Sequence, residues 1–276
     1  MDDLILISNN LPYLQEIKKK LGEIFAMKDL GEISGYLGIG IRRNRKDRII
    51  YLNQFKYIED ILKKYGMENA ASISTPMDVN KKLTKDMCPK TQEDIEEMQN
   101  IPYQSVIGSL MYLMLGTRPD IAYPVGVLSQ FNTNYGKQHW QAAKRIFRYL
   151  QGTKHLELVY DGSTELFGYT DADWGGDQVD RRSTTGFAFI FGGGAVSWSS
   201  KKQRTVALSS TEAEYMAATQ ATKEAIWFRR LLKEIGYFTS NTSTTIFADN
   251  QGCIALAKNP AYHARTKHID VQHYFI

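Results

Sequence analysis

Three acidic residues have the side chains and the positions that metal-dependent chemistry on a phosphodiester requires. Asp171 follows the run Leu-Phe-Gly-Tyr-Thr, Asp249 follows Thr-Ile-Phe-Ala, and Glu214 lies within Ser-Ser-Thr-Glu-Ala-Glu-Tyr-Met-Ala-Ala. Carboxylate oxygens are preferred ligands of Mg²⁺, and a pair of such ions can stabilise the attacking and leaving oxygens of an in-line displacement. The three acids therefore predict a site for two Mg²⁺ or Mn²⁺ ions, in which the same residues are metal ligands and catalytic groups.

Different elements must bring these carboxylates together. Two of the acids end short apolar runs that favour strands, near 166–174 and 244–249. Glu214 falls in the first turn of a helix that we expect at 210–235. The residues that share its helix face at intervals of four, three and four are small: Ala218, Ala221 and Ala225. Small side chains allow a helix to approach a sheet closely, which would carry Glu214 to the strand end that bears Asp171.

Each acid, taken alone, also fits a purely structural role. Glu214 can be the acid of a capping box that begins at Thr211, just as Glu212 can serve Ser209. Asp249 can cap the helix that follows it. Only the three acids together point to a metal site.

The composition is that of a globular protein with a mild excess of positive charge. The 276 residues are 43% hydrophobic and 23% charged, and the formal net charge is +4. This length suffices for two domains, and this charge permits nucleic-acid binding without requiring it. Cys88 and Cys253 have no metal-ligand or redox spacing. No apolar run approaches the roughly 20 residues that span a bilayer, and the N-terminus lacks the basic region of a signal peptide. We expect an intracellular protein without membrane association.

The pattern of apolar residues divides the chain into two parts around residue 155. In the first part we expect strands at 4–8, 35–42 and 48–52, the last two as a hairpin, and helices at 12–25, 54–65, 103–115, 121–131 and 139–150. Residues 72–102 contain three prolines and few large apolar residues, which indicates a linker or surface excursion. In the second part we expect strands at 166–174, 184–192, 195–200 and 244–249, with helices at 210–235 and 250–258.

Two groups of cations are candidate contacts to a nucleic-acid backbone. Lys144, Arg145 and Arg148 form one face of the helix expected at 139–150. Near the end of the chain, Arg265 and Lys267 lie in a second cationic segment. Such residues either contact phosphates or form a solvated surface, and the sequence leaves both interpretations open.

Several longer motifs resemble those of copia-type retrotransposon Pol polyproteins. Residues 166–276 resemble the ribonuclease H domain of that family, through the motifs Tyr169-Thr-Asp-Ala-Asp-Trp174, Ser209-Ser-Thr-Glu-Ala-Glu-Tyr215 and Ala248-Asp-Asn250. Residues 1–155 resemble the end of the reverse transcriptase, through Lys28-Asp-Leu-Gly-Glu-Ile33, Thr117-Arg-Pro-Asp-Ile121 and Lys144-Arg-Ile-Phe-Arg-Tyr-Leu150.

The resemblance implies an α/β fold, with a ribonuclease H-like mixed sheet and flanking helices. The implied divisions are a reverse-transcriptase palm remnant and start of the thumb at 1–75, a linker at 76–102, a helical thumb or connection region at 103–155, and the ribonuclease H-like domain at 156–276. The implied activity is cleavage of the RNA strand of RNA–DNA hybrids by water. Asp171, Glu214 and Asp249 match the first three metal-binding acids of the family. Asp173 is a lesser candidate, because the family pattern places the acid directly after Thr170.

Both ends of the chain depart from the family pattern. The family fold continues with a fifth strand and a fourth acid, so we expect the sheet to lack its last strand, with Asp270 as a weak substitute ligand. Asp2 and Asp3 resemble the paired palm aspartates, but the tyrosine before them and the upstream aspartate have no match. We therefore expect no polymerase activity.

Three interpretations of function remain at this point. One is a hybrid-cleaving nuclease, another is an inactive remnant that binds nucleic acid, and the third is a degenerate reading frame. The resemblance implies the rest of the Pol polyprotein as a partner and a location in cytoplasmic virus-like particles, the nucleus or both. It leaves the oligomeric state open.

Overall fold

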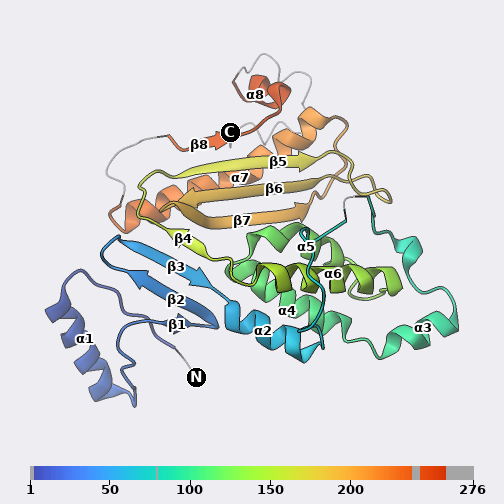
Figure 1. The fold of residues 1–276 in the computed structure, drawn as a ribbon. Helices are drawn as coiled ribbons and strands as arrows, with labels where there is room; N and C mark the ends of the chain where they lie inside the picture. The colour runs from blue at the N-terminus through green and yellow to red at the C-terminus, as the bar shows by residue number, and fades with distance from the viewer. Residues whose placement is uncertain (1–2, 79, 238–242, 259–276) are drawn as a thin grey trace.

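The structure is a computed structural model, and it describes residues 3–78, 80–237 and 243–258. Within these ranges the protein has two four-stranded sheets, a group of packed helices and one long helix (Figure 1). The expected mixture of helices and strands is confirmed. In the described residues no helix is both long enough and apolar enough to cross a membrane.

The first sheet is antiparallel throughout and takes its last strand from far along the chain. Its strands, in spatial order, are β1 (Gly35–Tyr36), β2 (Ile39–Asn44), β3 (Ile49–Asn53) and β4 (Leu158–Tyr160). The hairpin of β2 and β3 is confirmed. The strand expected at 35–42 is instead two strands, because Leu37 and Gly38 have positive φ and reverse the chain. The pairing of β4 with β3 was not predicted.

The N-terminal segment differs from the sequence prediction in one element. Helix α1 (Leu11–Ile24) forms where we expected it, and the Asn10 side chain accepts a hydrogen bond from the Tyr13 amide at its start. The strand expected at 4–8 does not form: residues 3–8 pair with no described strand, and Ile7 is 90% exposed. An apolar run forms a strand only when its backbone can pair with a neighbouring strand. Helix α1 itself buries none of its residues and lies apart from the packed helices (Figure 1).

The helices of the first part pack into a module with its own core. They are α2 (Phe55–Lys64), α4 (Tyr103–Gly116), the 3-10 turn η2 (Pro119–Ile121), α5 (Ala122–Ser129) and α6 (Lys137–Thr153). Large apolar side chains from all four α-helices are buried together in this core. The range expected as a linker contains the short helices η1 (Lys85–Met87) and α3 (Gln92–Gln99). A capping box between Thr91 and Asp94 forms the start of α3.

A cluster of polar contacts around the buried Arg118 links two parts of this helical module. Arg118 is 2% exposed, and its guanidinium pairs with Asp120 at 2.7 Å. The same group donates to the hydroxyl and the carbonyl of Thr153 on α6, while the Tyr149 hydroxyl donates to Asp120 at 2.7 Å. Burial raises the pKa of Asp120, but Arg118 and Tyr149 outweigh burial and the net pKa is lowered. The cluster therefore joins the turn after α4 to the end of α6.

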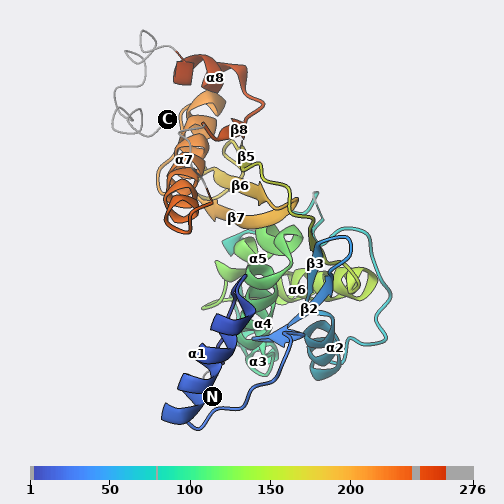
Figure 2. The same ribbon diagram turned by 90° about the vertical axis from the view of Figure 1, so that its left-hand side faces the viewer.

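The second sheet is mixed and is covered on one face by a long helix. Its spatial order is β7 (Gly194–Lys202), β6 (Thr184–Phe191), β5 (Phe167–Asp173) and β8 (Thr245–Phe247). Only β8 runs parallel to its neighbour, β5. Helix α7 (Ser210–Glu234) packs against β5 and β6 (Figure 2), and α8 (Gln251–Lys258) packs against α7. These strands and helices lie where the sequence predicted them.

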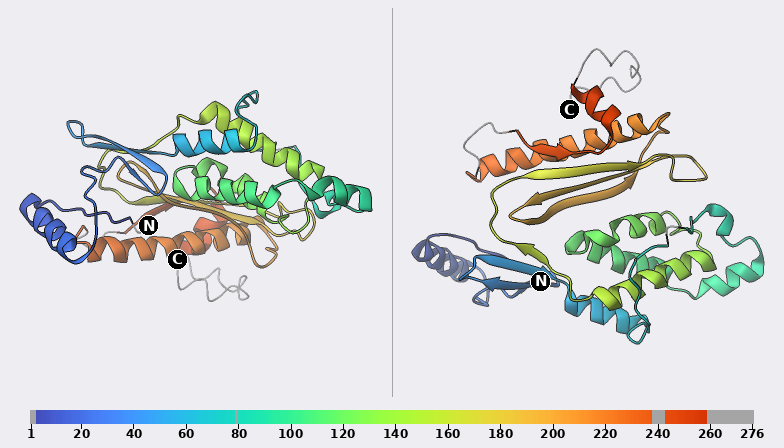
Figure 3. Two further views of the ribbon diagram at one scale, coloured as in Figure 1. Left: turned by 90° about the horizontal axis from the view of Figure 1, so that it is seen from below. Right: turned by 45° about the horizontal axis from the view of Figure 1, so that its top comes forward.

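The helical module and the second sheet are in direct contact. Trp198 on β7 donates its indole N–H to the Met114 carbonyl of α4 at 2.8 Å. The β7 strand also contacts α5, and the packed helices lie next to it in two further views (Figure 3). The Tyr160 hydroxyl of β4 donates to the Ala195 carbonyl at 2.7 Å. Strand β7 is therefore joined by hydrogen bonds both to the helical module and to β4 of the first sheet.

Candidate metal centre

The structure brings the three predicted acids into one cluster. Asp171, Glu214 and Asp249 each offer a carboxylate oxygen, and these oxygens all lie within 4.8 Å of one another. No other group of three or more potential metal ligands occurs in the described residues. Carboxylates at this spacing can share divalent cations.

Strand register explains why two of the acids are neighbours. In the parallel pair of β5 and β8, Tyr169 lies opposite Phe247. Asp171 and Asp249 each follow two residues later, so they leave the same edge of the sheet side by side. Asp171 is still paired with Gly186 on the other side, which fixes its backbone in the sheet.

Local hydrogen bonds at the start of α7 leave Glu214 available for the cluster. Ser209 caps the helix, because its side chain accepts a hydrogen bond from the Glu212 amide at 3.2 Å. The Glu212 carboxylate in turn accepts from the Leu208 amide at 2.8 Å. The structural role that Glu214 could have taken is thus filled by Glu212.

The same is true at the start of α8. The Asn250 side chain accepts a hydrogen bond from the Cys253 amide at 2.8 Å and caps this helix. Asp249, which could also have been the cap, points into the acidic cluster instead. At both helix starts a neighbouring residue makes the cap.

The alanine stripe on α7 has the predicted effect on packing. Ala221 is fully buried, and Ala225 and Ala218 are 4% and 9% exposed. Ala221 and Ala225 belong to the core formed with β6, whereas Ala218 packs toward Cys253 of α8. Small side chains let the helix lie close to the sheet, which places Glu214 beside Asp171.

Glu214 is buried beside two other carboxylates. It is 6% exposed, and its Oε2 atom is buried without a hydrogen-bond partner in the described part of the chain. Burial first, and then the charges of Asp171 and Asp249, raise the pKa of Glu214 to about 7. A buried carboxylate oxygen with two anionic neighbours is a poor arrangement for an unaccompanied carboxylate and a suitable one for a metal ligand. These residues therefore fit a divalent cation.

Asp173 does not join the cluster. Its carboxylate accepts a hydrogen bond from the Thr184 amide across the start of β6. Burial raises the pKa of Asp173, and the charge of Asp171 acts in the same direction. Asp173 thus closes the turn that follows β5, in keeping with its rank as the lesser candidate.

The predicted cations of α6 are turned toward another segment of the chain. Arg145 donates to the Thr75 hydroxyl at 2.9 Å, and Arg148 donates to the Ala71 carbonyl at 2.8 Å. Lys144 lies over the Trp140 ring, 5.7 Å from its centroid. Arg145 and Arg148 thus make hydrogen bonds to residues just before the predicted linker. The contact of these cations with nucleic acid remains a prediction.

The other candidates are placed only in part. Asp3 is described and exposed, whereas Asp2, Arg265, Lys267 and Asp270 lie outside the described residues. Lys82 is a cation that the sequence interpretation missed: it comes from the linker, and its Nζ donates to the Gly176 carbonyl just after β5, at 3.2 Å. No local pattern around Lys82 indicates this contact, because it depends on how the linker folds back.

Comparisons with known proteins agree on one family. A family model described as reverse transcriptase (RNA-dependent DNA polymerase) matches residues 1–79. The chain is 48% identical, over its whole length, to the retrovirus-related Pol polyprotein from transposon TNT 1-94 of Nicotiana tabacum, of which it covers 21%. It is 38% identical over its whole length to the Pol polyprotein from transposon RE1 of Arabidopsis thaliana, of which it covers 18%.

A shorter relative gives the same picture. The chain is 32% identical to a putative transposon Ty5-1 protein of Saccharomyces cerevisiae, with 81% of this chain and 71% of that protein covered. The chain spans about a fifth of the length of the two Pol polyproteins. No solved structure matches it significantly.

Proposed function

Because the chain belongs to the family of copia-type retrotransposon Pol polyproteins, we propose that residues 156–276 include a ribonuclease H-like domain. Its reaction would be cleavage of the RNA strand of an RNA–DNA hybrid, with water as the nucleophile. The substrate is the hybrid that reverse transcription produces, and the partner is the remainder of the Pol polyprotein. We place this activity in cytoplasmic virus-like particles, the nucleus or both.

The observation that carries the proposal is the convergence of three acids, one of which has a buried oxygen without a hydrogen-bond partner in the described residues. Asp171 lies in β5, Asp249 follows β8 and Glu214 lies in the first turns of α7, and one carboxylate oxygen of each lies within 4.8 Å of the others. Capping alone does not explain Glu214 or Asp249, since neighbouring residues make the caps. The buried Oε2 of Glu214 has no hydrogen-bond partner in the described residues. A metal-binding role accounts for all of these features.

The order of strands in the second sheet supports the same domain assignment. Three antiparallel strands are followed by a long helix, and the next strand returns parallel to the first of them. This connection places the end of β8 beside the end of β5, where the acids gather. A site at strand ends, with a helix start facing it, is suited to binding a phosphate backbone at the sheet edge.

Each acid has a definable part in the proposed reaction. Bound Mg²⁺ or Mn²⁺ would supply Lewis-acid stabilisation of the phosphate oxygens and activate the attacking water. Asp171 and Asp249 would hold the ions from the rigid sheet edge. Glu214 would give up its proton when the ions bind, because its pKa of about 7 leaves it partly protonated at neutral pH without them.

We expect no DNA synthesis from these residues alone. Asp3 is exposed, belongs to no strand, and gathers with no other acids in the described residues. A polymerase needs at least two carboxylates fixed around its metal ions.

A cleavage assay tests the proposal. The purified chain is incubated with an RNA–DNA hybrid labelled on the RNA strand, in Mg²⁺ or Mn²⁺, beside Asp171→Asn and Glu165→Gln variants. We expect cleavage by the wild type and by Glu165→Gln, whose exposed carboxylate lies outside the cluster. Asp171→Asn should lower the rate at least about 100-fold, since it removes a ligand of the catalytic ions.

Two results would count against a nuclease. Equal rates for the wild type and Asp171→Asn would show that any cleavage comes from a contaminant. Salt-dependent binding of the hybrid without metal-dependent cleavage would favour the alternative of an inactive nucleic-acid-binding remnant, because phosphate contacts weaken steeply with salt.

A further inference from the structure

We propose that four residues beside the acidic cluster form a nucleic-acid-binding surface to which both parts of the chain contribute. The four are Lys82, Tyr123, Trp174 and Arg181, and we call them the shared lip. Its ligand is the sugar-phosphate backbone of a nucleic-acid strand entering the acidic cluster. The proposal rests on the proposed function for its biological meaning, but binding to the lip can be measured without metal and without cleavage.

Trp174 is the aromatic centre of the lip. It directly follows β5 and stands three residues after Asp171. Its indole N–H donates to the Ala207 carbonyl at 3.1 Å, yet the residue is 56% exposed. A hydrogen bond that fixes one edge of the ring while much of the ring surface stays in water makes a rigid stacking platform. Proteins that bind single strands use exposed aromatic rings in this way.

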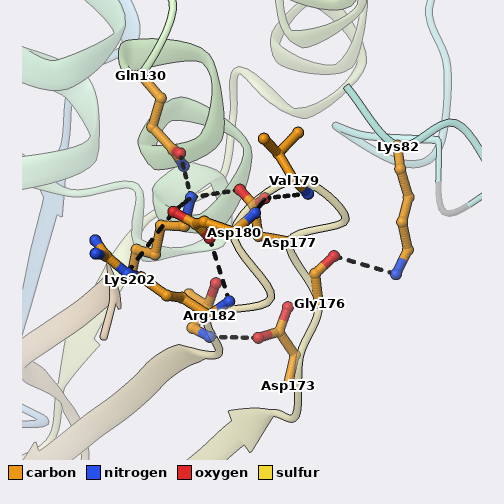
Figure 4. A network of polar contacts seen from close by, with 10 residues as sticks. Lys82, Gln130, Asp173, Gly176, Asp177, Val179, Asp180, Arg182 and Lys202 are labelled. Atoms are coloured by element: carbon orange, nitrogen blue, oxygen red, sulfur yellow. Dashed lines mark hydrogen bonds and ion pairs between the residues drawn. The ribbon is translucent and has the colours of Figure 1, made fainter. Parts of the chain in front are cut away.

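Two cations lie on either side of the glycines that follow Trp174. Lys82 is exposed, and its Nζ donates to the Gly176 carbonyl (Figure 4). Arg181 is also exposed, and its guanidinium packs on Gly175: a Cβ there would lie 3.5 Å from Nη2. Both charges are thus held near the backbone of one short turn. Phosphate groups are the natural ligands of cations placed beside an aromatic ring.

Tyr123 brings the helical module to the same place. It belongs to α5 and is 45% exposed. Burial, followed by the charges of Asp173 and Asp177, raises the pKa of its hydroxyl. Helix α5 contacts β7, and Gln130 just after α5 accepts a hydrogen bond from Lys202, so the helix that carries Tyr123 lies beside the turn after β5, although Tyr123 is about 50 positions earlier in the sequence. A tyrosine hydroxyl in such a position can donate to a phosphate oxygen.

The acids of this turn are already neutralised by other cations. Lys202 on β7 pairs with Asp177, and with Asp180 at 2.9 Å, and its Nζ also donates to the Gln130 side chain of the helical module (Figure 4). Arg182 lies 3.8 Å from Asp180. These pairs compensate Asp177 and Asp180, and the charge of Lys82 acts on Asp173, whose pKa it lowers against the larger effect of burial. Arg181 adds a further positive charge to the exposed side of the turn.

The network also explains how the lip keeps its shape. Lys202 connects the turn to β7 and to α5, so the turn cannot move independently of the helical module. Asp173 closes the base of the turn by accepting from the Thr184 amide. The turn that carries Trp174 and Arg181 is therefore tied to neighbouring elements before any ligand arrives, which reduces the entropy lost on binding.

A binding titration tests the lip apart from the reaction. The probe is a fluorescein-labelled RNA–DNA hybrid with a single-stranded overhang, and anisotropy is measured in EDTA at several salt concentrations. The variants are Lys82→Gln, Arg181→Gln, Tyr123→Phe, Trp174→Leu and Trp174→Phe. The matched control is Lys46→Gln, an exposed lysine in the turn between β2 and β3. Circular dichroism confirms that each variant is folded.

Each class of variant has a distinct expected result. Lys82→Gln and Arg181→Gln should each weaken binding about fivefold at low salt and reduce the salt slope by about one phosphate contact. Trp174→Leu should weaken binding about tenfold with an unchanged salt slope, and Trp174→Phe should restore most of it, because stacking needs a ring but no charge. Tyr123→Phe should weaken binding about twofold, and Lys46→Gln should have no effect.

The outcomes separate this inference from the proposed nuclease. If the wild type does not bind the hybrid, or if all lip variants bind as Lys46→Gln does, the lip is wrong even when the chain cleaves RNA. If the lip variants lose affinity as expected but the wild type cleaves nothing, the lip stands and the nuclease is wrong. Reduced binding with an unchanged salt slope for both cation variants would also overturn the phosphate contacts.

Discussion

Glu214 links the electrostatics of the metal centre to its chemistry. Without a cation, its carboxylate lies buried beside Asp171 and Asp249, and its pKa rises to about 7. A carboxylic acid must lose its proton to ligate a metal. Proton and metal therefore compete for the same oxygen in the pH range where the protein would work.

Metal affinity should consequently depend on pH around neutrality. Below pH 7 a proton occupies Glu214 and must leave when Mn²⁺ binds, so the affinity should fall up to about tenfold for each pH unit. Above pH 7 the carboxylate is already ionised, and the affinity should level off. Isothermal titration with Mn²⁺ at pH 6, 7 and 8 measures this dependence. Glu214→Gln should bind more weakly and lose the pH dependence; an unchanged dependence in that variant would assign the proton to another group.

The three acids could be predicted from the sequence because local patterns define the elements that carry them. Apolar periodicity and capping residues indicate the strand that contains Asp171, the strand that Asp249 follows and the helix start near Glu214. Which residue makes each cap could not be predicted, since Ser209 and Thr211 are chemically equivalent there. Lys82 and Tyr123 were missed altogether, because only tertiary folding brings them to β5.

At the scale of elements, the Arg118 cluster connects the turn after α4 to the end of α6. Arg118 is almost fully buried, and its charge is balanced by Asp120. Removing one partner of a buried ion pair leaves the other charge without compensation, which costs more than the pair itself contributes. The cluster is therefore a sensitive point between α4 and α6.

Asp120→Asn should lower the free energy of unfolding by about 3 kcal/mol. Lys137→Gln is the matched comparison, because its ion pair with Glu97 is more than half exposed and should contribute less than about 1 kcal/mol. Urea denaturation followed by circular dichroism gives both values. Similar small losses for the two variants would show that water reaches Arg118 and compensates its charge.

Strands illustrate what local patterns can and cannot predict. The β2–β3 hairpin and the strands β5, β6 and β7 form near the expected residues, because each has a sequence neighbour to pair with. The apolar run at 4–8 has the composition of a strand but no partner in the described residues, so it forms none. Conversely, β4 has only three residues and exists because β3 offers a free edge. In both cases the presence of a pairing partner, rather than the strand propensity of the residues, determined whether a strand formed.

At the scale of the whole molecule, the N-terminal region exposes an unusual amount of apolar surface. The side chains concerned are more than half exposed: Ile7, Leu11, Ile24, Phe25 and Leu30. They surround or belong to α1, which buries none of its residues. Contiguous exposed apolar surface marks an interaction site or a risk of self-association.

The purified chain should therefore self-associate through α1. Sedimentation velocity at increasing protein concentration should show growing average mass for the wild type. The double variant Leu11→Glu and Ile24→Glu should shift this association to at least about tenfold higher concentration, because charges oppose apolar contact. Ile95→Glu, on exposed α3, is the control and should behave as the wild type. Equal association of all three proteins would place the contact elsewhere.

Strand β4 has a consequence for inheritance. Along the chain it precedes the second sheet, but its backbone completes the first, with Leu158 opposite Leu52 and Tyr160 opposite Ile50. When the coding sequences of two related transposons recombine at a point between β3 and β4, the resulting protein receives a sheet with strands from both parents. Backbone pairing needs no particular side chains, whereas side chains that lie opposite each other on β3 and β4 must be compatible. Residues about 100 positions apart, such as Leu52 and Leu158, are thus linked in the substitutions that each tolerates.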